Sequence, residues 1–287
     1  MFKNPCYYGG EREVMTTEKF NSKECKSRIS KLVDDMTLFD DELMSHVFNE
    51  NIEATELLLR IIFNENIKVI SVKGEVELKS PIVGGRNIIL DVDAVDEAGR
   101  EIDVEVQGES NGASVERARF HSSMLDARML KSGQAFTDLK DSYVIFFYKK
   151  DKFKVGKPIY HIERYVKETG ETFDDGSHII YVNGNYAGEG ELADLIKDFH
   201  QKNPQDMHYK TLAVGVEHFK RTEKGRENMS EAVEEFAKEY AEEYADERDV
   251  EKVKNLMFNL NLTLKQALDA LGIQGSSRKY IINQIKR

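Results

Sequence analysis

The order of apolar and polar positions predicts an α/β fold in which two helices precede the first strands. Apolar residues recur at helical spacing at 38–48. A second helix follows at 52–63, with Asn51 as its N-cap, and it is apolar on most sides and therefore expected to be buried. Three strand-like runs come next, at 69–72, 87–95 and 102–106. A helix at 114–131 and a further strand at 143–148 follow them.

Shorter elements are expected after this α, β, β, β, α, β order. The pattern predicts extended segments at 158–165 and 178–182, a helix at 192–200 and a charged helix at 229–254. No internal repeat interrupts the order. The shorter segments are interpreted as extensions of the same domain.

The C-terminal region predicts a small helical module. Thr263 and Gln266 form a capping-box pattern before an apolar run, which Gly272 can end. The first 36 residues are polar and mixed in charge, and they predict an extension or lid without assignable structure. We therefore divide the chain into an N-terminal extension at 1–36, a main domain at 37–222 and a helical module at 223–287.

Composition narrows the class of protein. A chain of 287 residues with 40% hydrophobic residues is neither disordered nor too small to bury a core. It contains no run of about 18 apolar residues and no apolar signal-peptide core, which favours a cytoplasmic protein without a membrane span. Cys6 and Cys25 lack the spacing of a zinc site. The net charge of -11 argues against a wholly basic nucleic-acid binder but allows an enzyme whose acidic residues hold cations against DNA.

The most informative segment, residues 90–107, has the pattern of a β-hairpin. A three-residue loop at 97–99 places Gly99 in the left-handed position, which pairs residues whose numbers sum to about 196. Asp91 then faces Glu105, and Asp93 faces Asp103.

One face of this hairpin is apolar and the other is acidic. A solvated strand face is one interpretation of the acidic side. Against it, like charges opposite one another destabilise a ladder, and neither Lys nor Arg is interleaved on this face. A hard divalent cation such as Mg²⁺ would convert the repulsion into a site, so both interpretations stay open. The polar positions of the face are Asp91, Asp93, Asp103, Glu105 and Gln107.

An aspartate on the first strand and Glu-x-Gln on the second, within this order of elements, resemble the PD-(D/E)XK nuclease superfamily. The resemblance is to the Rpn-like recombination-promoting nucleases and transposases, which are similar in having glutamine where many relatives have lysine. It covers roughly residues 37–165. It implies a restriction-endonuclease-like α/β core that hydrolyses phosphodiester bonds in DNA.

The resemblance also implies roles for individual residues. Asp91 and Glu105 would hold Mg²⁺ or Mn²⁺, which polarises the phosphate and lowers the pKa of an attacking water. Gln107 would occupy the lysine position, where its amide can orient a water but cannot supply a positive charge. Glu56 would be the acid of the leading helix, although it could equally pair with Arg60 on the helix surface.

The helix after the hairpin carries candidates for phosphate binding. Arg117, His121 and Arg128 fall on one stripe, and Arg117 would orient the DNA strand. His121 could instead act as an acid, and a solvated helix face explains the stripe equally well. The segment 83–86 lacks the residues of a phosphate-binding loop and is expected to be a turn.

A second functional hypothesis is a nuclease-like scaffold that binds nucleic acid or protein without cleavage. Its contacts could come from the C-terminal module, which could also be a packing element or an oligomer contact. A homo-oligomer is compatible with either hypothesis. The basic residues of the module are Lys265, Arg278, Lys279, Lys286 and Arg287, opposed only by Asp269.

Overall fold

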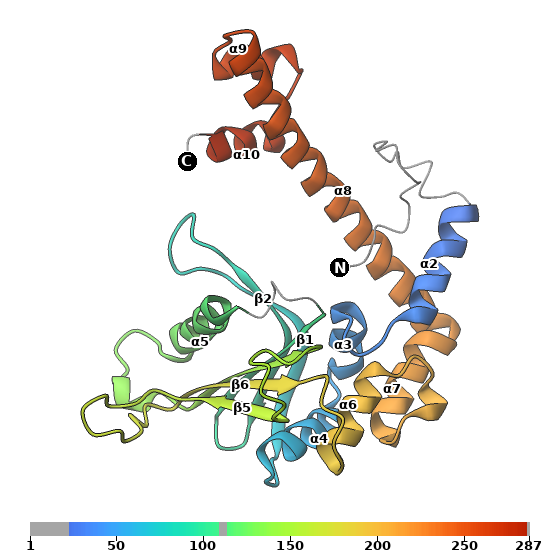
Figure 1. The fold of residues 1–287 in the computed structure, drawn as a ribbon, viewed down its shortest axis with the longest axis vertical. Coiled ribbons are helices and arrows are strands. Elements are labelled where there is room, and N and C mark those ends of the chain that lie inside the picture. The colour runs from blue at the N-terminus through green and yellow to red at the C-terminus, as the bar shows by residue number, and fades with distance from the viewer. Residues whose placement is uncertain (1–22, 109–113, 286–287) are drawn as a thin grey trace. The chain divides into compact units, whose positions relative to one another are not determined.

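A six-stranded mixed sheet forms the centre of the main unit (Figure 1). The computed structural model describes residues 23–108 and 114–285. Strands follow the order β1-β2-β3-β4-β6-β5, in which β3, β4 and β6 are parallel and the remaining pairs are antiparallel. This confirms the predicted α/β, restriction-endonuclease-like fold. The strands are β1 (Val69–Leu78), β2 (Ile88–Asp96), β3 (Glu101–Gln107), β4 (Ser142–Tyr148), β5 (Ile159–Ile162) and β6 (Ser177–Asn183).

Helix α5 (Val115–Met129) connects β3 to β4 and covers one face of the sheet (Figure 1). Ser114 begins it by accepting a hydrogen bond from the Arg117 backbone N–H, as expected of an N-cap serine. Ala118 and Leu125 of the helix pack in a common core with Val144 and Phe146 of β4. Because Asp103 and Glu105 lie beside Val144 and Phe146 in the parallel register, these acids share the face that α5 covers.

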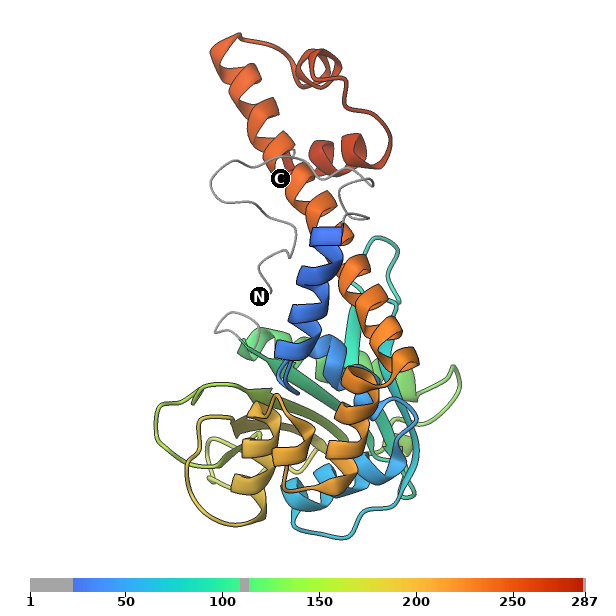
Figure 2. The same ribbon diagram turned by 90° about the vertical axis from the view of Figure 1, so that its right-hand side faces the viewer.

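A layer of helices covers the opposite face (Figures 1 and 2). Phe147 of β4 stacks on Phe199 with ring centroids 4.4 Å apart, and Phe63 packs edge-on against Tyr143. The predicted cap of the second helix is confirmed, because the Asn51 side chain accepts a hydrogen bond from the Ala54 N–H. The helices are α3 (Asp41–Phe48), α4 (Ile52–Phe63), α6 (Glu191–His200) and α7 (Lys210–Arg221), and short 3₁₀ helices lie at Phe136–Asp138 and Pro204–Asp206.

Helix α7, which the sequence pattern did not predict, carries a buried lysine. Lys220 is 1% exposed, and its ammonium donates hydrogen bonds to the carbonyl oxygens of Asp34, Met36 and Lys202 at 2.9, 2.6 and 2.6 Å. Three backbone acceptors offset the desolvation of the charge. Lys220 thereby ties α7 to the segment that leads into α3.

Contacts divide the described chain into two units. One spans residues 33–229; the other holds residues 230–285 with residues 23–32. The predicted boundary at 222/223 falls at the start of the long helix α8 (Glu223–Asn259), whereas this division falls inside it. None of the described helices is long and apolar enough to cross a membrane.

The C-terminal unit has its own small apolar core, formed by Val253, Leu268, Ile273 and Ile281. Helix α9 (Leu264–Ala270) begins with the predicted capping box of Thr263 and Gln266. Helix α10 (Gly275–Ile285), which was not predicted, completes the core.

Part of the predicted unstructured extension is helical. Helix α2 (Lys23–Asp35) buries Ile29 and Val33, which supplies the structure that the polar pattern of these residues left unassigned. Residues 1–22 lie outside the described residues, and so does Cys6.

Candidate active site

The acidic hairpin forms as predicted as far as its regular ladder extends. Gly99 has a φ of 81°, and Asp93 pairs with Asp103 across β2 and β3. The ladder ends at the next pair, Val92 with Val104. From that point the two strands no longer supply one another with backbone partners.

Two carboxylates take the place of those backbone partners. The Asp91 N–H donates a hydrogen bond to Glu105 Oε1 at 3.2 Å, and the Val106 N–H donates to Asp91 Oδ2 at 2.9 Å. Buried backbone donors need acceptors, so the parting of the strands itself fixes both side chains. Asp91 and Glu105 are thus brought together, though by this reciprocal exchange rather than by simple cross-strand pairing.

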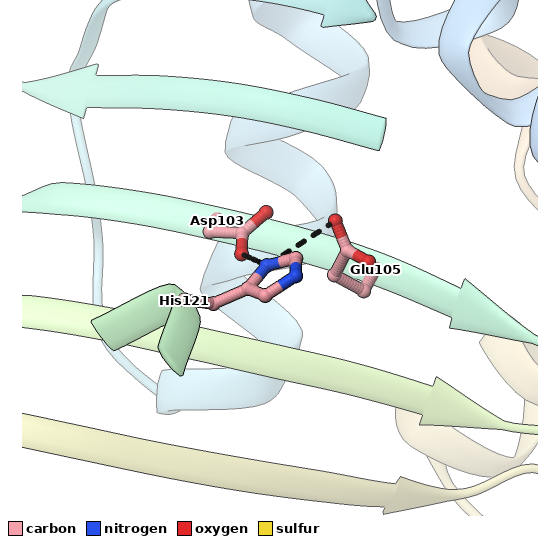
Figure 3. A group of neighbouring side chains, drawn as sticks. All are labelled: Asp103, Glu105 and His121. Atoms are coloured by element: carbon pink, nitrogen blue, oxygen red, sulfur yellow. Dashed lines mark hydrogen bonds and ion pairs between the residues drawn. The ribbon is translucent and has the colours of Figure 1, made fainter. Parts of the chain in front are cut away.

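Helix α5 closes the acidic face with His121, which Figure 3 shows beside Asp103 and Glu105, and with Arg117. His121 Nδ1 lies 2.8 Å from Asp103 Oδ2, and the Arg117 guanidinium donates from Nε to His121 Nε2 at 3.3 Å. Since arginine can only donate, Nε2 is the acceptor and Nδ1 carries the proton toward Asp103. Arg117 also donates from Nη2 to Glu105 Oε2 at 2.5 Å.

This closure bears on the interpretation of the acidic face as solvated. Asp103 and Glu105 are fully buried, and His121 is 2% exposed. The solvated strand face and the solvated helix stripe are therefore both wrong. Arg117 and Arg128 of α5 do pair with Glu105 and Asp93, so the cations near this face come from α5 rather than from the strands themselves.

Burial makes these acids hard to ionise together. Desolvation and the charge of Asp103 raise the pKa of Glu105 to about 8. Desolvation, followed by the charge of Glu105, raises the pKa of Asp91 well above its usual range. Desolvation, followed by the charge of Asp91, does the same to the pKa of Asp103. Burial lowers the pKa of His121, which agrees with a neutral imidazole. A cluster of acids whose charged forms are disfavoured gains most from a bound cation.

The donor set fits a hard divalent cation. Asp103, Glu105 and His121 each present a potential ligand atom, all within 4.8 Å of one another (Figure 3). Asp103 Oδ1 is buried and has no hydrogen-bond partner among the described residues. Both ring nitrogens of His121 are engaged, so we assign the imidazole to supporting its neighbours. Carboxylate oxygens remain, which are the ligands that Mg²⁺ and Mn²⁺ prefer.

Gln107 lies at the end of β3, on the same face as Glu105, and is partly exposed. Its backbone carbonyl accepts a hydrogen bond from the Lys149 N–H. The position is therefore at the edge of the acidic cluster, as its spacing from Glu105 implies.

Glu56 is not brought to this cluster. Its carboxylate accepts a hydrogen bond from the Val69 N–H at 3.1 Å and lies 3.5 Å from Lys68. Val69 pairs with Asp96, beside the hairpin loop and away from Asp91. The alternative pairing with Arg60 was also wrong, because Arg60 pairs with Glu191.

Arg128 forms an ion pair in the layer next to the cluster. Its guanidinium binds Asp93 through two hydrogen bonds of 2.7 Å and also pairs with Glu101. Through its two Nη groups, Arg128 neutralises the outer acids of the face. The structure does not place it with Asp91 and Glu105.

Asp41 is an acid near the site that the sequence pattern did not single out. It lies in the first turn of α3, and its charge contributes to raising the pKa of Asp91. In the sequence an acid at this position looks like any residue that interacts with the positive end of a helix. Glu56, further along the leading helices, therefore received the assignment instead.

The order of elements, the parting strands and the Asp91–Glu105 exchange together indicate a nuclease fold. A comparison with protein families gives a match to the PD-(D/E)XK nuclease family transposases over residues 43–254. The chain belongs to this family. No curated protein and no solved structure matches the sequence. Family membership supports a nuclease or transposase-like role and contact with nucleic acid, and PD-(D/E)XK nucleases typically use divalent metals.

Proposed function

We propose that this PD-(D/E)XK protein is a Mg²⁺- or Mn²⁺-dependent DNA endonuclease. The observation that supports this most is the reciprocal exchange between Asp91 and Glu105, which holds two carboxylates where β2 and β3 part. These residues would hold the cation, with the unpartnered oxygen of Asp103 beside them. When bound, the cation supplies positive charge to the scissile phosphate and favours ionisation of an attacking water.

Arg117 would bind and orient the phosphate. The motif position that often carries lysine holds Gln107 here, and an amide has no charge. Arg117 already contacts Glu105, so it brings a guanidinium to the site from α5. His121, which is hydrogen-bonded to Asp103, accepts a hydrogen bond from Arg117 Nε and so would orient the guanidinium. Gln107 would then orient the water through its amide.

The biological role we propose is transposase-like or recombination-promoting, in keeping with the family. A scaffold that binds nucleic acid or protein without cleavage is the second candidate. One observation favours it: in the described structure Arg117 occupies an oxygen of Glu105 that a cation would use. Cleavage requires that this ion pair opens when the cation and the DNA enter.

Nicking of supercoiled DNA separates the two candidates. Purified full-length protein should convert supercoiled plasmid to nicked circles with millimolar Mn²⁺ or Mg²⁺, and EDTA should prevent the reaction. The products are resolved by agarose electrophoresis. Binding of the plasmid without any nicking in either metal would overturn the nuclease proposal in favour of the scaffold.

A further inference from the structure

The hairpin between β1 and β2 projects from the sheet and ends in an apolar tip (Figure 1). We call residues 79–87 the hairpin tip. Ile82 is 72% exposed and Val83 is fully exposed. Single exposed apolar residues are common, but two adjacent β-branched side chains at the end of a projecting hairpin form a small apolar surface that water solvates poorly.

The tip is an ordered turn. The Gly85 N–H donates to the Ile82 carbonyl at 2.9 Å, and Gly84 has a φ of 77°, as position i+2 of a type II turn requires. Ser80 Oγ accepts a hydrogen bond from the Ile82 N–H, and Asn87 Oδ1 accepts one from the Ser80 N–H. The two apolar side chains are thus held outward before any partner binds, which lowers the entropic cost of binding.

The charge of the tip differs from that of the whole protein. Residues 78–90 contain two cations, Lys79 and Arg86, and no acid, in a chain with a net charge of -11. The nearest acid in the sequence, Glu77, is bonded by the Asn87 amide at 2.8 Å. This combination suits duplex DNA, because basic residues attract its phosphates and apolar side chains can insert between its stacked bases.

The tip lies close to the proposed active site. Val83 precedes Asp91 by eight residues, of which the last lie on β2, and at about 3.3 Å per residue this spans at most about 26 Å. That length corresponds to at most about eight base pairs at about 3.4 Å each. The charge of Arg86 also contributes to lowering the pKa of His121, which agrees with this proximity. A duplex with its scissile phosphate at Asp91 is therefore within reach of the hairpin tip.

We propose that the hairpin tip is a DNA wedge, which inserts Ile82 and Val83 at a base step within about eight base pairs of the cleaved phosphate. Lys79 and Arg86 contact the phosphates on either side of that step. Apolar side chains that enter the minor groove unstack a step and bend the duplex. The inference rests on the proposed function for the position of the DNA, but it concerns recognition and not cleavage.

DNA binding in EDTA tests the wedge without cleavage. The double variant Ile82→Ser, Val83→Ser keeps both glycines of the turn. Because burial of one aliphatic side chain is worth about a factor of ten in affinity, the variant should weaken duplex binding at least about tenfold. Fluorescence anisotropy measures the affinity. The matched control is Val214→Ser. Val214 is 56% exposed and lies on α7, on the side of the sheet opposite α5. This variant should bind DNA as the wild type does.

Two further measurements separate insertion from charge attraction. Duplexes that carry 2-aminopurine at successive steps should become brighter at one step with the wild type, and the double serine variant should lose this signal. Lys79→Gln with Arg86→Gln should instead reduce the slope of log affinity against log salt by about 2, one for each lost phosphate contact. The serine variant should leave that slope unchanged.

The outcomes distinguish this inference from the proposed function. A serine variant with wild-type affinity and an unchanged 2-aminopurine signal would overturn the wedge, even if the protein cleaves DNA. A serine variant that alters only the sedimentation behaviour would overturn it in favour of a contact between two copies of this chain. A wild type that binds and unstacks DNA but never nicks it would support the wedge and remove the nuclease proposal.

Discussion

Exchange of Glu105 for glutamine should lower the rate of Mn²⁺-dependent DNA cleavage roughly a thousandfold, in keeping with the loss of a group that stabilises transition-state charge. Glutamine keeps the oxygen that accepts the Asp91 N–H, so the strands should stay in place. It removes the negative charge that would bind the cation and that also fixes Arg117. Single-turnover nicking under saturating protein measures the effect.

The matched control is Glu101→Gln, the same exchange four residues earlier on β3. Glu101 pairs with Arg128 in the neighbouring layer, so this variant loses an ion pair outside the site. A partly exposed ion pair contributes about 1 kcal/mol or less to stability, so this variant should stay folded. Because the lost ion pair lies outside the site, its cleavage rate should stay within about threefold of the wild type. Equal losses in both variants would indicate a general effect on folding and would contradict the assignment of Glu105.

The metal-free protein should become less stable as the pH rises from about 5 to 8. The pKa of Glu105 is about 8 in the folded protein against 4.5 for an ordinary glutamate, so the folded state retains a proton that the unfolded state has released. The unfolded state binds fewer protons in this window, and stability therefore falls with pH. One such group contributes up to about 1.4 kcal/mol per pH unit, which makes a loss of about 2 kcal/mol or more across the window.

Urea unfolding in EDTA at several pH values measures this slope, and Glu105→Gln provides the comparison. The free energy of unfolding of the variant should fall less steeply than that of the wild type. Added Mn²⁺ should stabilise the wild type most at pH 8, because the cation favours the ionised carboxylate that burial disfavours. Parallel pH curves for the two proteins would show that Glu105 does not titrate in this window.

Local sequence patterns predicted the hairpin well because its determinants are local. A glycine that adopts a positive φ sets the loop, and the loop sets the register that pairs Asp93 with Asp103. Alternation then assigns the acids to one face. The end of the ladder at Val92 could not be predicted in this way, because there β2 continues along β1 while β3 continues along β4.

The burial of the acidic face depends on tertiary packing. Arg117, His121 and Arg128 look like a solvated stripe when α5 is considered alone. Only the crossover from β3 to β4 places that stripe on the sheet, where Arg117 and Arg128 pair with Glu105 and Asp93. The helix α7 was missed for a related reason: its buried side includes Lys220, which a hydrophobic pattern counts as exposed.

Glu56 shows the limit of assignment by resemblance. An acid in a leading helix matches the family pattern, yet its side chain serves the start of β1 through Val69. Asp41, with the same charge, acts on Asp91 from the first turn of the preceding helix. Which of several acids reaches a site depends on the angle between helix and sheet, and this angle is not encoded in spacing along the chain.

The central claim, that the carboxylates at the parting strands form a cation site, is tested most directly by Mn²⁺ binding. Electron paramagnetic resonance of free Mn²⁺ at pH 7.5 should show saturable binding to the wild type, with unchanged binding to Glu101→Gln. Asp91→Asn and Glu105→Gln should each weaken binding by at least about tenfold, as expected for loss of a charged ligand. Mn²⁺ binding of equal affinity in the wild type and in both of these variants, or no binding to any of them, would contradict the account.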